Sequence, residues 1–279
     1  MNKLMYVWFA VKTLFSTCDS DHKVNNFKRV RSEYKISKIG KLPSLISESS
    51  GLARSQNANI FWSHNDSGGK PELYGFDLSG KLISIKTIPQ ARNADWEDLA
   101  EDKLGNIYIG DFGNNAAIRS EYEIYKHNTL DSTTQVIKFK YAEQQKPSKN
   151  SAGRIFDSEA FFHHGNSLYL FSKNWGDDPV VRMYRISDKP GDYVVSVADS
   201  IPVNAQVTSA DISPDGKRFV LLTYGKVLVF EVSDEGVNFS KPVGCFRLVK
   251  KQNEAILFLN NTDMLVTAEQ GDMYRITYR

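Results

Sequence analysis

Glutamate recurs at the start of three short, strand-like segments of this 279-residue sequence. When five such segments are aligned at one position, that position holds Ser50, Glu97, Glu159, Ala210 and Glu254. Carboxylates that converge on one place repel one another, so they either bind protons more tightly or hold a cation. Hard cations such as Ca²⁺ take carboxylate oxygens. One interpretation of the pattern is a Ca²⁺ site formed by these glutamates, with Asp211 one residue further along its segment.

The same carboxylates also have a structural interpretation. Repeated structural units reuse residues, and a carboxylate at the start of a strand can accept hydrogen bonds from backbone N–H groups or from Ser and Thr hydroxyls. Such a carboxylate would hold neighbouring units together and bind no ligand. The sequence leaves both interpretations open.

Loops after the second strand of each unit add further polar groups. A Ca²⁺ ion there would polarise an ester, lactone or phosphoester and would lower the pKa of a bound water. On this hydrolase hypothesis Glu159 or Asp111 is the general base, and His64 or Lys173 is an orienting group. The candidate ligand-binding residues are Asn65, Asp66, Arg119, Lys173, Asn174 and Trp175.

The competing hypothesis is a non-catalytic surface module that binds a glycan or a protein. Trp62, Trp96 and Trp175 would then stack on sugars, although Trp62 and Trp96 also fit core positions. We expect a small-molecule or glycan ligand, a monomer and no nucleic-acid partner. The formal net charge is only +2, and without Lys3 and Lys12 the basic and acidic residues balance, so no global field attracts nucleic acid.

These residues lie on a repeat. Each unit has an inner strand, a tight polar turn and two further strands, and the third strand carries an aromatic at Tyr74, Tyr125, Tyr184, Phe230 and Tyr274. Their intervals of about 44 to 59 residues are typical of four-stranded propeller blades. We therefore predict an all-β propeller of five blades, with six as the alternative.

The outer strands follow the units along the chain. We expect residues 193–199 to be the outer strand of the third blade. The fifth unit reaches the C-terminus without an outer strand, and residues 33–43 can supply it, which would close the ring. The predicted domain is one propeller over 33–279.

The N-terminus has the features of an export signal. Residues 1–17 start basic and continue with an apolar run too short to span a membrane. Cleavage before Cys18 would leave a lipidated cysteine on a stem of residues 18–32, in an outer-membrane or periplasmic lipoprotein of a Gram-negative bacterium. The alternative is an ordinary signal peptide of a secreted protein. Two cysteines give no disulfide framework, and Cys245 is interpreted as a buried strand thiol.

Several motifs resemble those of a family of secreted bacterial β-propeller proteins. They are, in order between about residues 46 and 278, SESSGL, WSHNDSGG, DWEDLA, IYIGDFGNN, DSEAFF, LYLFSKNWGD, TSADISPDGK and NEAILF. More distantly the chain is similar to the esterase-like phytase domain and to gluconolactonase-type propellers, which usually have six blades. The close resemblance implies export and a propeller. The distant one implies a central Ca²⁺ held by acidic and amide side chains, with Glu97, Glu159, Glu254, Asn114 and Asn174 as candidates by position.

Overall fold

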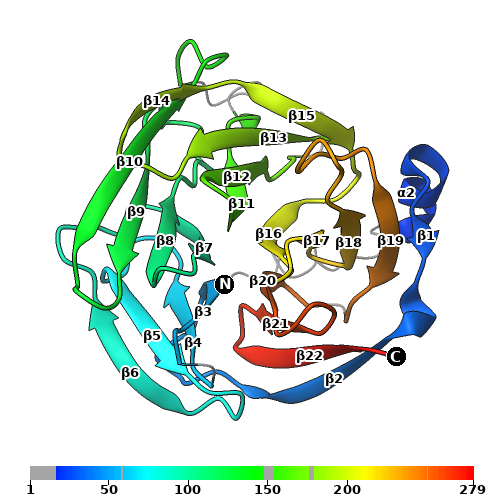
Figure 1. The fold of residues 1–279 in the computed structure, drawn as a ribbon, viewed down its shortest axis with the longest axis horizontal. Coiled ribbons are helices and arrows are strands. Elements are labelled where there is room, and N and C mark those ends of the chain that lie inside the picture. The colour runs from blue at the N-terminus through cyan, green and yellow to red at the C-terminus, as the bar shows by residue number, and fades with distance from the viewer. Residues whose placement is uncertain (1–16, 58, 148–153, 176–178, 250) are drawn as a thin grey trace.

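Five sheets stand around a common central axis, which we call the channel, with one inner strand of each sheet nearest to this axis (Figure 1). This computed structural model describes residues 17–57, 59–147, 154–175, 179–249 and 251–279. The five-bladed β-propeller expected from the repeat is confirmed, and the described residues contain no sixth blade.

The blades follow one another along the chain, each running from the channel outwards. Blade 1 contains β3 (Ser49–Arg54), β4 (Phe61–Asn65), β5 (Glu72–Phe76) and β6 (Leu82–Thr87). Blade 2 contains β7 (Trp96–Glu101), β8 (Asn106–Asp111), β9 (Tyr122–Asn128) and β10 (Thr134–Tyr141). Blade 3 contains β11 (Ser158–His164), β12 (Ser167–Ser172), β13 (Val180–Ser187) and β15 (Val197–Pro202).

Blades 4 and 5 complete the ring. Blade 4 contains β16 (Val207–Ile212), β17 (Arg218–Thr223), β18 (Lys226–Glu231) and β19 (Pro242–Arg247). Blade 5 contains β20 (Asn253–Phe258), β21 (Met264–Ala268), β22 (Asp272–Tyr278) and β2 (Tyr34–Lys41). The antiparallel pairing of β2 with β22 confirms the predicted closure by an N-terminal strand.

The expected outer strand of blade 3 is wrong in part. Residues 193–199 divide between two strands: β14 (Gly191–Val195) pairs in parallel with β10 of blade 2, and only β15 pairs with β13. Blade 2 therefore has a fifth strand donated by the chain of blade 3. The exchange covers the edge of β10 and ties two blades together.

The core lies between the faces of neighbouring sheets. Alternation along the strands places aromatic and aliphatic side chains on both faces of each blade, because each blade is sandwiched between two others. The rings of Phe162 on blade 3 and Phe219 on blade 4, for example, lie with their centroids 5.7 Å apart. These layers fix the blades and leave the ends of the inner strands facing the channel.

Residues 18–30, which we call the N-terminal clasp, pack on blade 4 and form no free stem. The clasp contains α2 (Cys18–Asn25) and β1 (Lys28–Arg29), which pairs in parallel with β19 and lies at its outer edge (Figure 1). A short 3-10 helix, η1 (Arg31–Glu33), leads on to β2. Within the described residues no helix is long and apolar enough to cross a membrane, and residues 1–16 of the predicted signal lie outside them.

A disulfide joins Cys18 of the clasp to Cys245 of β19. The interpretation of Cys245 as a free buried thiol is therefore wrong. The two cysteines are 227 residues apart in the sequence, and only the docking of the clasp brings their Cα atoms to 5.7 Å. A sulfur in a disulfide cannot also carry a thioether-linked lipid, so this disulfide and lipidation of Cys18 exclude each other.

Candidate functional site

A β-bulge interrupts the start of every inner strand. The residues at the bulge are Ser50, Glu97, Glu159, Thr208 and Glu254. Bulges re-aim side chains, and here they supply one residue per blade to the same end of the channel. The three glutamates share a level as predicted, but blade 4 contributes Thr208 in place of Ala210, because its inner strand starts two residues earlier than the alignment assumed.

A second tier of polar residues lies two positions before the first. It consists of Glu48, Asp95, Asp157, Gln206 and Gln252. Asp95 and Asp157, the two members that meet the glutamates of the first tier, were not predicted from the sequence. The repeated Asp-x-Glu spacing, in Asp95–Glu97 and in Asp157–Glu159, is the signal that would have found them.

Three carboxylates from blades 1 and 2 form what we call the outer acid group: Asp66, Asp95 and Glu97. One ligand atom from each lies within 4.8 Å of the others. Glu97 is only 4% exposed, yet its Oε1 has no hydrogen-bond partner among the residues that the structure describes. A buried carboxylate oxygen without a partner is costly unless a cation or proton satisfies it.

Gly113 gives the outer acid group its room. A Cβ at this position would lie 2.0 Å from Glu97 Oε1 and 2.5 Å from Asp95 Oδ2. Both carboxylates therefore converge on the space beside the Cα of Gly113. Any larger residue there would fill the space where their oxygens meet.

Asn93 connects the two loops that carry this group. Its Nδ2 donates to the carbonyl of Asp66 (2.8 Å), and its Oδ1 accepts the N–H of Trp96 (3.2 Å). The side-chain amide thus holds the end of blade 1 against the start of blade 2. This contact fixes the approach of Asp66 to Asp95 and Glu97.

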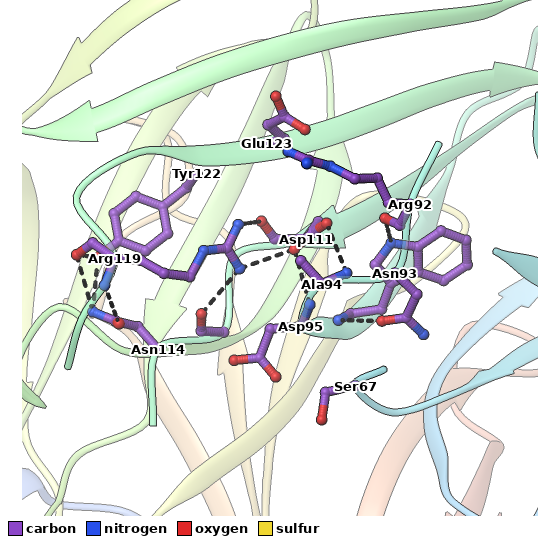
Figure 2. A network of polar contacts seen from close by, with 12 residues as sticks. Ser67, Arg92, Asn93, Ala94, Asp95, Asp111, Asn114, Arg119, Tyr122 and Glu123 are labelled. Carbon is purple, nitrogen blue, oxygen red and sulfur yellow. Dashed lines mark hydrogen bonds and ion pairs between the residues drawn. The ribbon is translucent and has the colours of Figure 1, made fainter. Parts of the chain in front are cut away.

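A further network fixes the loop that carries Asp95 (Figure 2). Asp111 Oδ1 accepts the N–H of Asp95 (3.1 Å) and Arg119 Nη1–H (2.9 Å), and its Oδ2 accepts the N–H of Ala94 (3.3 Å). Asp95 directs its own carboxylate away from these contacts. The predicted general base Asp111 and the predicted ligand-binding Arg119 are consequently engaged with each other, and they position Asp95.

Glu97 also belongs to a second cluster, the inner acid group, with Asp157 and Glu159. Asp157 Oδ1 accepts the N–H of Asn114 (2.6 Å), and its Oδ2 accepts Trp175 Nε1–H (2.7 Å). Glu159 forms a buried ion pair with Lys173. Glu97, Glu159, Lys173 and Trp175 were predicted for the site, and the structure does bring them together.

Burial and mutual repulsion disfavour ionisation of the acids. Burial, followed by the neighbouring Asp66, raises the pKa of Asp95 to about 7. Burial and then Glu159 raise the pKa of Glu97 well above its ordinary value. Burial raises the pKa of Glu254 to about 8, although Lys173 opposes the effect. A site with these properties attracts either protons or a cation.

Two predicted site residues, His64 and Asn65, make contacts away from the acid groups. His64 is fully buried, donates Nδ1–H to the carbonyl of Asn65 (2.9 Å) and meets the ring of Trp96 edge-on, with its pKa lowered to about 4 by burial. It is a core imidazole, and among the described residues it has no ion pair with an acid of either group. Asn65 accepts the N–H of Glu48 (3.1 Å) and donates to Leu45 (2.8 Å).

The two predicted amide ligands also stabilise loops. Asn114 Oδ1 accepts the N–H groups of Ile118 (3.0 Å) and Arg119 (2.9 Å). Asn174, with a φ of 66°, donates Nδ2–H to the carbonyl of Val203. Both amides therefore bond to the backbone of loops, and neither belongs to the acid groups.

Asp98 is a carboxylate of the channel that holds neighbouring blades together by accepting hydrogen bonds. Its Oδ2 accepts the N–H groups of Phe161 (3.3 Å) and Ala210 (3.1 Å) and the hydroxyl of Ser209 (3.0 Å). The hydroxyl oxygen of Ser209 in turn accepts the N–H of Ile256 (3.1 Å). This buried cluster links blades 2, 3, 4 and 5 across the channel.

Asp211 belongs to the opposite end of the channel. Its Oδ2 accepts the N–H of Phe258 (2.6 Å) and lies 3.9 Å from Arg54 Nη1. The other terminal nitrogen of Arg54, Nη2, pairs with Glu101. The prediction that Asp211 joins the glutamates as a metal ligand is therefore wrong. The sequence alignment placed the inner strand of blade 4 two residues too late, and this shift explains the error.

We expect the cation-free protein to lose stability as the pH rises. The folded-state pKa values of Asp95 and Glu254, about 7 and about 8, exceed the unfolded values of about 4. The folded state then holds more protons, so stability is highest near pH 4 and falls through pH 8. Melting curves in EDTA should show this fall, and Ca²⁺ should remove much of it. The pKa of Asp211 is also raised to about 7, and this residue, far from the proposed ion, adds to the loss of stability with and without Ca²⁺. The melting temperature should therefore still fall with pH in Ca²⁺, but less steeply than in EDTA. Equal falls in the two conditions would contradict the expectation.

Comparisons with known proteins found similar structures but no similar sequence. No protein-family model and no curated protein sequence matches the chain. A selenomethionine-substituted virginiamycin B lyase from Staphylococcus aureus is similar in structure, with a TM-score of 0.45, 10% identity and coverage of 88% of this chain and 100% of that one. A catalytically inactive variant of that lyase with quinupristin has a TM-score of 0.43 and 9% identity, and the match covers 83% of this chain and 66% of that one. At such identity the likeness concerns the propeller fold alone.

Proposed function

We propose that the outer acid group binds one Ca²⁺ ion and that the protein is a Ca²⁺-dependent hydrolase of esters or lactones. One observation carries the cation site: Glu97 Oε1 is buried without a hydrogen-bond partner beside Asp66 and Asp95. Carboxylate oxygens are the ligands that Ca²⁺ prefers, and its variable coordination tolerates ligands from two loops and a strand. A bound Ca²⁺ would polarise the substrate carbonyl and lower the pKa of a bound water.

Glu254 is the proposed acid–base residue. It shares the level of Glu97 and Glu159, is half-buried, and has a pKa raised to about 8 by burial. A carboxyl with such a pKa can take a proton from water and return it to a leaving oxygen near neutral pH. Glu159, the base expected from the sequence, is held by the ammonium of Lys173 and suits the role less well.

The charge of the channel mouth favours an uncharged substrate. Lys173 is a cation among many acids, and Arg119 is paired with Asp111. The acids that influence one another around this mouth are Glu48, Asp66, Asp95, Glu97, Asp157, Glu159, Glu254 and Glu269. One Ca²⁺ would leave the mouth negative, so a neutral ester or lactone fits better than a phosphoester.

The test is a hydrolysis assay with EDTA-treated protein, with and without added Ca²⁺. The panel contains p-nitrophenyl acetate, a γ-lactone, a δ-lactone and p-nitrophenyl phosphate. We expect Ca²⁺-dependent turnover of the neutral substrates. Glu254→Gln should lower kcat by about 100-fold or more while Ca²⁺ binding persists, and the exposed control Glu121→Gln should match the parent. No turnover of any substrate by Ca²⁺-loaded protein would contradict the hydrolase proposal but leave the cation site standing.

The glycan-binding alternative has less support. Trp62 and Trp96 are buried core residues. Trp175 donates its indole N–H to Asp157, and the cationic groups of Arg154 and Lys173 lie 5.0 and 5.1 Å from its ring centroid. Its ring is therefore committed to contacts within the protein, which leaves less of it to stack on a sugar.

Export is part of the proposal. The disulfide between Cys18 and Cys245 supports it, because disulfides persist in oxidising compartments outside the cytosol. We propose a signal peptide over residues 1–17 and an unmodified Cys18 that enters the disulfide. Intact-mass spectrometry of exported protein tests this: a mass increased by a diacylglyceryl group would contradict it.

A further inference from the structure

The two acid groups share a residue. Glu97 belongs to the outer group with Asp66 and Asp95 and to the inner group with Asp157 and Glu159. Within each group the ligand atoms lie within 4.8 Å of one another. Carboxylates so arranged describe two adjacent cation positions with Glu97 between them.

The inner position already faces a cation of the chain itself. Lys173 follows β12, and its Nζ forms the ion pair with Glu159 and lies 3.5 Å from Asn115 Oδ1. The ammonium is 5.1 Å from the ring centroid of Trp175, whose indole N–H binds Asp157. The side chain is thus surrounded by acceptors and by an aromatic face, as a bound cation would be.

The backbone holds Lys173 in this place. Its N–H donates to the carbonyl of Asp157 (2.8 Å), and its own carbonyl accepts the N–H of Val207 (2.9 Å). The lysine is therefore fixed to blade 3, which carries two acids of the inner group, and to the start of blade 4. Its side chain is 8% exposed, so it cannot swing into solvent without leaving buried carboxylates behind.

The outer position differs in this respect. Among the described residues no lysine or arginine forms an ion pair with Asp66 or Asp95, and the guanidinium of Arg119 is paired with Asp111. Glu97 Oε1 likewise has no hydrogen-bond partner. One position therefore has a built-in cation, and the other does not.

We infer that Lys173 occupies the second cation position of the site and thereby limits it to a single Ca²⁺ ion. This inference rests on the proposed cation site and goes beyond it, because it fixes the number of ions and the residue that sets this number. Lys173 is a positioning residue in this account. Its ammonium neutralises Glu159, so Glu97 remains available as a ligand of the ion in the outer acid group.

The prediction concerns the number of bound ions. Native mass spectrometry of the full mature protein in Ca²⁺ should show one specific ion. Lys173→Gln removes the ammonium and leaves the inner carboxylates without a cation, so this variant should bind two. The double variant Lys173→Gln/Glu159→Gln removes one charge of each sign and should return to one ion. Lys140→Gln, which removes a lysine from an exposed pair with Glu121, is the matched control and should bind one.

The outcomes separate the two proposals. No ion on the parent protein would overturn both the cation site and this inference. Two ions on the parent, or one ion on a folded Lys173→Gln variant, would overturn the inference and leave the cation site intact. If Lys173→Gln does not fold, Lys173→Met replaces it, because methionine keeps an unbranched side chain of similar length without the ammonium; one ion on that folded variant would likewise overturn the inference.

Discussion

Glu97→Gln is expected to weaken Ca²⁺ binding by about 100-fold or more. Two unit charges about 4 Å apart contribute about 4 kcal/mol in a partly screened site, and the variant deletes one such charge at the point where both acid groups meet. Isothermal titration of EDTA-treated protein measures the loss. In EDTA near pH 8, the same variant should melt at a higher temperature than the parent, because it removes a repelled, buried charge.

The direction of that melting shift separates the two interpretations of Glu97. A carboxylate that only held blades together would lose hydrogen bonds in the variant and would lower the melting temperature. Asp98, whose carboxylate accepts hydrogen bonds from neighbouring blades, represents that behaviour. A lower melting temperature in EDTA together with unchanged Ca²⁺ affinity would exclude Glu97 as a ligand.

Gly113→Ala provides a second variant with no change in charge. Its Cβ would occupy the space between Glu97 Oε1 and Asp95 Oδ2 and should also weaken Ca²⁺ binding. Gly69→Ala is the matched control, because the nearest atom to a Cβ there is 3.7 Å away. Equal affinities for the two alanine variants would contradict the placement of the ion.

Asp21→Ala is expected to lower the free energy of unfolding by about 3–5 kcal/mol. Asp21 Oδ2 lies 2.5 Å from Lys226 Nζ, and the two side chains are 1% and 0% exposed. Removing one partner of a buried pair leaves the other charge without compensation, and burial already lowers the pKa of Lys226. Urea unfolding of the disulfide-bonded protein measures the change.

The clasp supplies its own control. Asp19 lies on the same helix and pairs with Arg29, but both side chains are 60% exposed. Asp19→Ala should therefore cost less than about 1 kcal/mol. Similar losses for Asp19→Ala and Asp21→Ala would mean that the clasp does not bury Lys226 in solution.

Local patterns predicted most of the fold. Alternating strands and polar turns recur once per blade, and the missing outer strand of the fifth unit indicated closure by the N-terminal strand. Pairings that join distant segments were not predictable in this way. The transfer of β14 to blade 2 and the disulfide of Cys18 with Cys245 both depend on how the blades pack, and no local pattern specifies them.

The site was predicted in part for a similar reason. Glu97, Glu159 and Glu254 were found because they repeat in register, whereas Asp95 and Asp157 precede the strands and were missed. The bulges decide which residues face the channel, and an alignment that ignored them placed Ala210 and Asp211 in the wrong tier. Asn114, Arg119 and Asp111 have the residue types of ligands, but hydrogen bonds within their loops already engage them.

The central claim is that the channel mouth holds a divalent cation. The most direct test is the melting temperature of the full mature protein at pH 8, first in EDTA and then in increasing Ca²⁺. A single saturable site predicts a rise that grows with Ca²⁺ concentration and reaches about 5 °C at 100 times the Kd. A melting temperature unchanged by Ca²⁺, Mg²⁺ and Mn²⁺ would contradict the account and would leave the acid groups as proton-binding structural elements.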